Sequence, residues 1–284
     1  MKMTDSTDLP EDSFPEELIE RKQIYKTLVA PPLPEPHPAE ASQYARFVGI
    51  PGHYQAAMSE TRFVLVGGGG LNSWVALGLA RSGAKSLTIV DPDLVERSNL
   101  TRQLFTAEDL CKPKALCLAN NLLTHTVEPA CITGIALRFE EAVERFILPA
   151  DIFITGVDRN DCRLRVAQLA RERRVPAVFA MLSTDGMRCH VFLQGSDPGD
   201  ACLWCALPNL DPTAAQPCAS AIITSCYFAG ALTLFFVLRA LMGWPPNISP
   251  FNWREADLLG NVPDRTGFVA RRPDCSVCSR DDTR

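Results

Sequence analysis

Three glycines in the first third of the chain have the spacing of a phosphate-binding turn. Gly67, Gly69 and Gly70 follow the apolar run FVLV at 63–66 and precede a segment with helical periodicity. Backbone N–H groups at the start of a helix have no partner inside the helix, and the helix dipole favours an anion there. The turn therefore predicts a site for phosphate.

The residues after this turn carry more charge than one phosphate requires. Asp91 ends the next apolar run, where a carboxylate commonly accepts hydrogen bonds from ribose hydroxyls. The strings DPDLVERSNLTRQLF and KPK add further polar side chains, namely Asp93, Asn99, Arg102, Gln103 and Lys114. Arginine and lysine bind phosphate oxygens as bidentate and point cations. This set predicts a nucleoside triphosphate.

A second carboxylate suits the metal ion that accompanies a triphosphate. Asp158 comes just after the apolar run DIFITGV at 151–157. In an open α/β sheet the ligand crevice lies at the carboxyl ends of the strands, and Mg²⁺ prefers oxygen ligands. Asp158 is therefore the predicted magnesium ligand. A dinucleotide site is disfavoured, because Asn72 occupies the third glycine position of a G-x-G-x-x-G fingerprint.

The elements that must position these residues alternate along the chain. Apolar runs and helical segments follow one another from Phe63 onward, and we expect strands at 63–67, 86–91, 130–137, 151–158 and 176–182, with helices at 73–81, 113–124, 140–146 and 162–173. This alternation predicts an α/β fold, with a Rossmann-like, mainly parallel sheet and helices on both faces. A further strand at 189–194, a loop, a long apolar helix at 219–243 and short antiparallel strands in the tail follow.

Two C-x-x-C pairs predict a metal site. Cys202 and Cys205 form one pair, and Cys275 and Cys278 form the other. Four thiolates from two such turns make a closed, tetrahedral and structural Zn²⁺ site. A redox dithiol is the alternative for either pair alone. A shared zinc ion would tie the C-terminal extension to the domain.

Cys218 allows two interpretations. It stands just before the long apolar helix, where the dipole favours a thiolate, so it is a candidate nucleophile. The alternative is an inert, half-buried cysteine.

Composition limits the classes of partner. The net charge of −5 argues against binding nucleic acid through the overall field of the protein. The odd number of cysteines, eleven, and the lack of a secretory signal favour a reducing cytoplasm. The helix at 219–243 is long enough to cross a bilayer, but its small polar residues favour a buried helix shared by the core and a subunit interface.

The first 40 residues differ in composition from the rest. They are acidic and then proline-rich, with room for a short helix at 16–28. We expect residues 1–40 to be an N-terminal extension that acts as a spacer, with a docking segment as the alternative. Residues 41–284 would then form the main domain.

Four strings together resemble a known family. VLVGGGGLNS, VDPDLVERSNLTRQ, KPK and TGVDRNDCRLR resemble the adenylation domain of the ubiquitin-activating-enzyme superfamily, and most closely its ThiF/MoeB/HesA branch, from about Tyr44 to Cys278. The resemblance implies that the glycines line ATP, Asp91 holds the ribose, and Asp158 binds Mg²⁺. It also implies that Asn99, Arg102 and Gln103 contact the phosphates and that Lys114 neutralises the leaving pyrophosphate.

The resemblance implies a reaction and its partners. The enzyme would adenylate the C-terminal glycine of a small β-grasp carrier ending in Gly-Gly, either ubiquitin-like or a sulfur carrier. Arg46 resembles an arginine that the family lends to the neighbouring subunit, which implies a homodimer. Transfer of the carrier to Cys218 as a thioester or persulfide, or to a conjugating enzyme or sulfur donor, would follow.

Some residues depart from the family pattern, and other functions stay open. Asn72 and Cys111 stand where glycine is usual, and Arg159 stands where asparagine is usual. The alternatives are adenylation of a ribosomal peptide in natural-product maturation, and a non-catalytic nucleotide-binding scaffold in a heterodimer.

Overall fold

The centre of the fold is a group of parallel strands within one larger sheet. The computed structural model describes residues 24–31, 43–47, 50, 55–213, 220–245 and 248–278. Its central strands are β4 (Cys131–Ile135), β3 (Ser86–Val90), β2 (Arg62–Val66), β5 (Ile152–Thr155) and β6 (Ala177–Leu182), in that spatial order and all parallel. The chain moves outward from β2 through β3 to β4 and then crosses back to β5. The order therefore reverses between β2 and β5, where such folds bind ligands.

Antiparallel strands extend both edges of this centre. On one side β1 (Tyr25–Val29) pairs with β4, and on the other β7 (Arg188–Gln194), β8 (Trp253–Asp257) and β9 (Arg265–Gly267) continue from β6. The predicted α/β class, the Rossmann-like parallel centre and the short antiparallel strands of the tail are confirmed.

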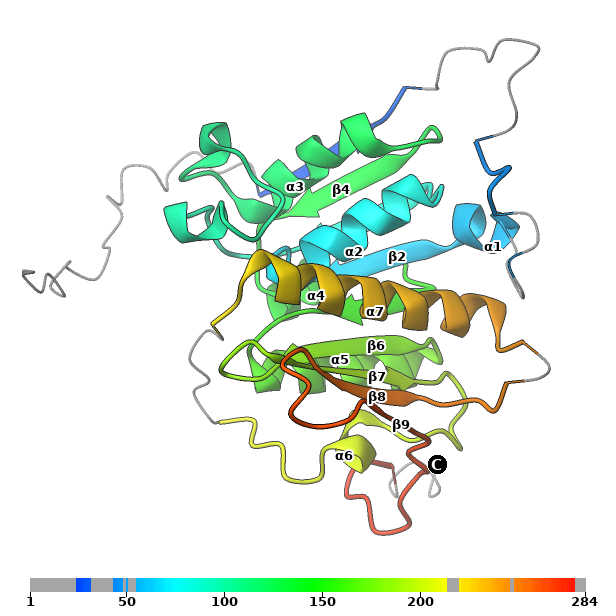
Figure 1. Ribbon diagram of the computed structural model, residues 1–284. Coiled ribbons are helices and arrows are strands. Elements are labelled where there is room, and N and C mark those ends of the chain that lie inside the picture. The colour runs from blue at the N-terminus through cyan, green and yellow to red at the C-terminus, as the bar shows by residue number, and fades with distance from the viewer. Residues whose placement is uncertain are drawn as a thin grey trace, which may run out of the picture.

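Helices cover both faces of the sheet (Figure 1). One face carries α1 (Gln55–Glu60), α2 (Gly70–Arg81), α3 (Lys114–Leu122) and α7 (Ile223–Met242), and the other carries α4 (Phe139–Arg145) and α5 (Asn160–Arg173). Side chains alternate along β2, so Phe63 and Leu65 enter the first core and Val64 and Val66 the second. Both faces of β2 are thus buried, which explains its continuous apolar run.

The long apolar helix is α7. By length and composition alone it is able to cross a membrane, with a mean hydropathy of 1.7, and half of its most apolar window is buried in the protein. It packs on α2, β6 and β7. The apolar residues of α7 that face α2, β6 and β7 therefore belong to the hydrophobic core. Tyr227, Phe228 and Phe235 of the same helix remain partly exposed.

The short helix that the sequence allowed at 16–28 is contradicted in its C-terminal part, and residues 16–23 lie outside the described residues. Tyr25 to Leu28 belong to β1, which pairs in antiparallel register with β4 from Tyr25 opposite Ile135 to Val29 opposite Cys131. Aromatic and β-branched residues in YKTLV favour a strand, and the edge of β4 supplies its hydrogen-bond partners. The domain boundary at residue 40 stays a prediction, although β1 places part of the proposed extension in the sheet.

Candidate active site

The glycine turn joins β2 to α2 at the point where the strand order reverses. Gly67 has a φ of 88°, which favours glycine, and its N–H donates to Val90 O at 2.8 Å. A Cβ on Gly67 would lie 2.9 Å from Val157 Cγ1, so a larger residue would clash there. The turn leads into α2, whose first residue is Gly70 and whose N-cap is Gly69. The backbone N–H groups that open α2 therefore face the carboxyl ends of the strands.

Asp91 lies directly behind this turn and is only 4% exposed. Its Oδ2 accepts a hydrogen bond from Gly68 N at 2.6 Å, and its Oδ1 accepts one from Asp93 N at 2.8 Å. Burial raises the pKa of Asp91 to about 6, with Asp93 adding to the effect, while Lys114 and the two backbone donors oppose it. The carboxylate thus fixes the turn and remains at the cavity wall.

Lys114 is the buried cation beside these carboxylates. It opens α3 and is 8% exposed, and its Nζ lies 2.9 Å from Asp93 Oδ2. Burial alone would lower the pKa of Lys114, but the charges of Asp91 and Asp93 outweigh this and raise it. The ammonium group therefore stays protonated in a site that already contains two carboxylates.

The segment after Asp93 is folded by its own side chains. A short 3-10 helix, η2 (Arg97–Asn99), is closed by Asn99, whose Oδ1 accepts from Glu96 N at 3.0 Å. Arg102 Nη1 donates to Ser98 O at 2.5 Å. Gln103 is buried, and its Oε1 has no donor within the described residues. An unsatisfied buried amide oxygen in a cavity wall is a position for a ligand donor.

Asp158 and Arg163 come from the β5–α5 connection on the other side of the reversal. Asp158 is exposed in the loop before α5. Arg163, at the end of the first turn of α5, is 6% exposed, and its Nη1 donates to Asn160 Oδ1 at 2.8 Å. Burial lowers the pKa of Arg163 to about 10, partly offset by the charge of Asp158, so the guanidinium remains a cation at neutral pH.

One cavity of about 790 Å³ joins these groups. Its lining includes every residue predicted to bind the nucleotide, namely Gly67, Gly69, Gly70, Asp91, Asp93, Asn99, Arg102, Gln103, Lys114 and Asp158. The volume lies within the usual range for a small-molecule pocket. The cavity thus combines backbone N–H groups, cations and carboxylates, which is the chemistry that binds a polyanion together with a divalent cation.

The cavity lining also includes residues that the sequence motifs did not indicate, and two of them, Arg163 and Cys226, bear on its chemistry. Arg163 lines the cavity from α5, and Cys226 lines it at the start of α7. A Cβ on Gly70 would lie 2.9 Å from Cys226 Sγ, so α7 sits directly over the glycine turn. For Arg163 a signal did exist, because it shares the inward face of α5 with Asn160 and Ala167 at helical spacing.

Two of the departures from the family pattern have structural explanations. Asn72 is fully buried, and its Nδ2 donates to Val66 O and Gly67 O, both at 2.9 Å. Its amide therefore ties the end of β2 to α2. Cys111 has a φ of 62°, the left-handed conformation in which glycine is favoured. The third, Arg159, forms an ion pair with Asp161.

Of the predicted catalytic residues, Arg46 does not line the cavity, and Cys218 is not among the described residues. Arg46 is exposed beside Tyr44, which donates to Glu128 Oε1 at 2.8 Å and packs on Gly83, just past the end of α2. Arg46 thus lies at the opposite end of α2 from the glycine turn and does not line the cavity of its own chain. Cys218 falls outside the described residues, so its role stays a prediction.

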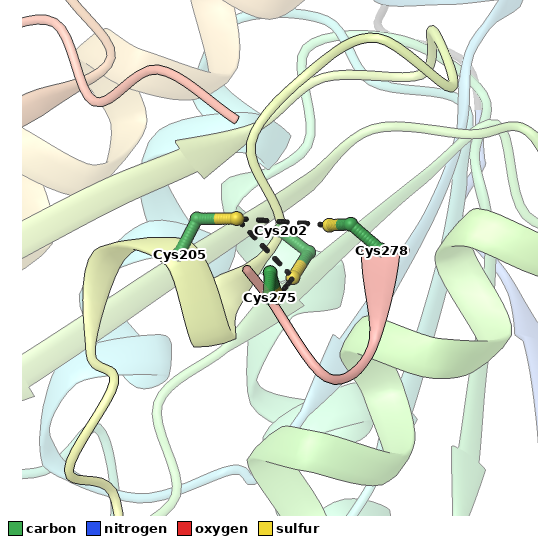
Figure 2. Close-up of side chains that lie close together, drawn as sticks. All are labelled: Cys202, Cys205, Cys275 and Cys278. Atoms are coloured by element: carbon green, nitrogen blue, oxygen red, sulfur yellow. Dashed lines mark hydrogen bonds between the residues drawn. The ribbon is translucent and has the colours of Figure 1, made fainter. Parts of the chain in front are cut away.

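The two C-x-x-C pairs meet in one buried cluster (Figure 2). The Sγ atoms of Cys202, Cys205, Cys275 and Cys278 all lie within 4.8 Å of one another. Cys202 Sγ lies 3.6 Å from Cys275 Sγ, and Cys205 Sγ lies 3.6 Å from Cys278 Sγ. A tetrahedron with metal–sulfur bonds of about 2.3 Å has edges of roughly 3.8 Å, so the cluster has the size of a four-thiolate site.

This cluster lies away from the cavity and ties down the tail. Cys202 is the N-cap of the short helix α6 (Leu203–Ala206), and Cys205 lies within this helix. The other pair follows β9 in the chain. The backbone N–H of Arg272 donates to Cys205 Sγ at 3.4 Å. The cluster joins segments far apart in the chain and contributes no residue to the cavity lining, so a structural metal fits it better than a catalytic one.

Comparisons with known proteins agree with this geometry. A model of the ThiF family matches residues 41–277. The sulfur carrier protein ThiS adenylyltransferase of Bacillus subtilis is 34% identical over 159 residues, which are 54% of this chain and 47% of that protein. The ATP-dependent ubiquitin transferase-like protein Cap2 of Escherichia coli is 25% identical over 248 residues, 79% of this chain and 41% of that protein.

A third relative matches over most of its length. The sulfur carrier protein adenylyltransferase of Thermus thermophilus is 29% identical over 242 residues, 81% of this chain and 86% of that protein. Among solved structures, that of E. coli MccB with ATP superposes with a TM-score of 0.67 at 22% identity, covering 79% of this chain and 69% of that chain. At this identity the likeness shows a shared fold. The chain spans less than half of the first two relatives.

Proposed function

Since the chain belongs to the ThiF family, we propose that it is an ATP-dependent adenylyltransferase that activates the C-terminal glycine of a small ubiquitin-like or sulfur-carrier protein. The observation that carries the proposal is the gathering of Lys114, Asp91 and the glycine turn at one cavity. A buried lysine with a raised pKa beside helix-opening N–H groups is suited to phosphate oxygens.

The proposed reaction is a displacement at the α-phosphorus of ATP. An oxygen of the carrier's terminal carboxylate forms a bond to that phosphorus, and the bond from the phosphorus to the bridging oxygen of the β-phosphate breaks. Pyrophosphate leaves with the electron pair, and the acyl-adenylate remains. This step needs positioning and neutralisation of charge but no enzyme nucleophile, which agrees with the lining of the cavity.

Each side of the cavity has a proposed role. Asp91 accepts from the ribose hydroxyls, while Asn99, Arg102 and Gln103 contact the phosphates. Lys114 neutralises charge on the leaving pyrophosphate, for which its ion pair with Asp93 must loosen. Asp158 would hold Mg²⁺, which would neutralise phosphate charge when bound.

Further parts of the proposal concern assembly and metal content. Zn²⁺ is the proposed occupant of the four-cysteine cluster, because its thiolate set and size fit a structural zinc site.

We propose a homodimer in which Arg46 reaches the cavity of the neighbouring subunit. The exposed position of Arg46, outside the cavity of its own chain, is consistent with this role. Transfer of the carrier to Cys218, to a conjugating enzyme or to a sulfur donor belongs to the same proposal. The free cysteines fit a reducing cytoplasm.

ATP–pyrophosphate exchange tests the proposal. Purified full chain is incubated with Mg·ATP and labelled pyrophosphate, alone and with candidate carriers that end in Gly-Gly. We expect exchange that depends on a carrier with a free C-terminus and disappears when the terminal glycine is removed. Exchange driven by a ribosomal peptide instead would support the peptide-adenylating alternative. Tight ATP binding with no exchange for any acyl substrate would support the scaffold alternative.

A further inference from the structure

Arg163 is a buried cation that the roles above leave without a task. It is 6% exposed and lines the cavity from the inward face of α5. Its Nη1 donates to Asn160 Oδ1 at 2.8 Å, and its Nε finds no acceptor in the part of the chain that the structure describes. Within the described residues no carboxylate lies close enough to Arg163 for an ion pair. A buried guanidinium without a counter-charge is costly unless an anion completes it.

Two neighbouring cations of the cavity are paired with carboxylates, and the other two, Arg102 and Arg138, are more exposed than Arg163. Lys114 Nζ lies 2.9 Å from Asp93 Oδ2, and Arg159 pairs with Asp161. Asp158 acts on Arg163 only at longer range. In the proposed function the charge of Asp158 is shared with Mg²⁺. Among the described residues, Arg163 is therefore the cavity cation that is both buried and without a carboxylate in ion-pair range, and an incoming anion would gain most from it.

We infer that Arg163 binds the terminal carboxylate of the acyl substrate; this rests on the proposed function. Its place in the fold favours a carboxylate over a phosphate. The phosphates belong at the glycine turn, where α2 begins, whereas Arg163 lies on α5, beyond β5 and toward β6. From there the cavity wall continues with Ala180, Met181 and Leu182 at the end of β6.

This continuation suits a polypeptide tail. The cavity wall at β6 is largely apolar, so it is suited to contact the C-terminal segment of a polypeptide and not a phosphate. This wall ends at the guanidinium of Arg163, which offers two N–H donors to the terminal carboxylate. The guanidinium would hold the carboxylate oxygens and leave Asp158 and Lys114 to the nucleotide. Arg163 would then select a free C-terminus over a blocked one, because an amide cannot accept two charge-assisted hydrogen bonds.

Calorimetry with two matched peptides tests this role. The full chain is first titrated with Mg·ATP. Protein saturated with the α,β-methylene analogue of Mg·ATP is then titrated with acetyl-Ala-Gly-Gly as the free acid and as the carboxamide. Arg163→Gln removes the charge, and Arg163→Lys keeps the charge but removes the fork. Arg165→Gln is the control, because Arg165 is partly exposed on the same helix, does not line the cavity, and has its Nη1 3.9 Å from Glu172 Oε1.

For the wild type and the control we expect the free acid to bind at least tenfold more tightly than the amide. In Arg163→Gln the remaining preference for the free acid should be less than threefold. In Arg163→Lys the preference should be about threefold to tenfold smaller than in the wild type. In both variants the Kd for Mg·ATP should change less than threefold. If Arg163→Gln does not fold, Arg163→Lys supplies the same comparison.

Three results would overturn the inference. They are a wild type that binds neither peptide, a wild type that binds both equally, and an Arg163 variant that weakens Mg·ATP binding tenfold, which would make Arg163 a phosphate ligand. If the wild type does not bind Mg·ATP, the proposed function fails, and the peptides titrated without nucleotide still decide the role of Arg163.

Discussion

The carboxylate of Asp91 accepts a hydrogen bond from the backbone N–H of Gly68, with 2.6 Å between Oδ2 and the nitrogen. One side chain thereby both shapes the glycine turn and faces the proposed nucleotide cavity. Because the carboxylate is buried, its protonation should affect folding as well as binding.

Replacement of Asp91 by asparagine should change how stability depends on pH. Burial raises the pKa of Asp91 to about 6 in the folded protein, against about 3.9 in an unfolded chain. A group whose pKa is raised by folding contributes stability below its unfolded pKa and loses it as the pH rises through its folded pKa. Between pH 4 and pH 7 the wild type should therefore lose roughly 2–3 kcal/mol relative to Asp91→Asn. Urea denaturation across this range measures the difference, and parallel curves would contradict it.

Loss of the Lys114 ammonium should remove the proposed chemistry. In Lys114→Ala the carboxylates of Asp91 and Asp93 would remain beside the phosphates without their cation. We expect ATP–pyrophosphate exchange to fall at least about 100-fold, as when a group that stabilises developing charge is removed. Lys112→Ala, an exposed neighbour, is the matched control and should stay within a factor of two or so of the wild type. Equal rates in both variants would remove Lys114 from the mechanism.

Restoring glycine at position 72 should weaken the protein. Asn72→Gly deletes the Nδ2 donor to Val66 O and Gly67 O and places glycine in the first turn of α2. Val66 O keeps the N–H of Gly156 as a donor, but Gly67 O loses its side-chain donor, and this loss together with the entropy of glycine should cost roughly 2–4 kcal/mol of unfolding free energy. Chemical denaturation measures this loss. A gain in stability would mean that Asn72 is a defect in the turn.

Glycine at position 111 should have the opposite effect. Cys111 adopts a φ of 62°, which costs a residue with a side chain about 1–2 kcal/mol. Cys111→Gly relieves this strain but adds freedom to the unfolded chain, so we expect a net gain of about 0.5–1 kcal/mol. Cys111→Ala retains a Cβ and should show no such gain in the same denaturation experiment.

The four-cysteine cluster should hold one zinc ion per chain. Elemental analysis of protein purified without added chelator should give that ratio, and Cys278→Ser should lower both the zinc content and the melting temperature. Cys131→Ser, at an exposed cysteine outside the cluster, should change neither. Full stability of the metal-free protein would show that the cluster does not depend on a metal.

The sequence predicted the central strands, and the residues that it indicated for the nucleotide lie along one cavity. The β2–α2 turn, the carboxylate after β3 and the one after β5 are local patterns, and parallel strands bring their carboxyl ends to one edge. Other features depended on distant partners. The strand at Tyr25–Val29 forms because the edge of β4 is available to it, which a local reading of 16–28 as a helix did not include.

Residue types and spacing alone determined the phosphate turn, the carboxylates, the lysine and the paired cysteines, because each belongs to a short motif whose chemistry is local. Only the tertiary structure decided which of these groups share a cavity, that Asn72 ties β2 to α2, and that Arg163 is buried with no ion-pair partner among the described residues. Burial and missing partners arise from packing between α5, β5 and β6, which are distant in the sequence, so no local pattern encodes them.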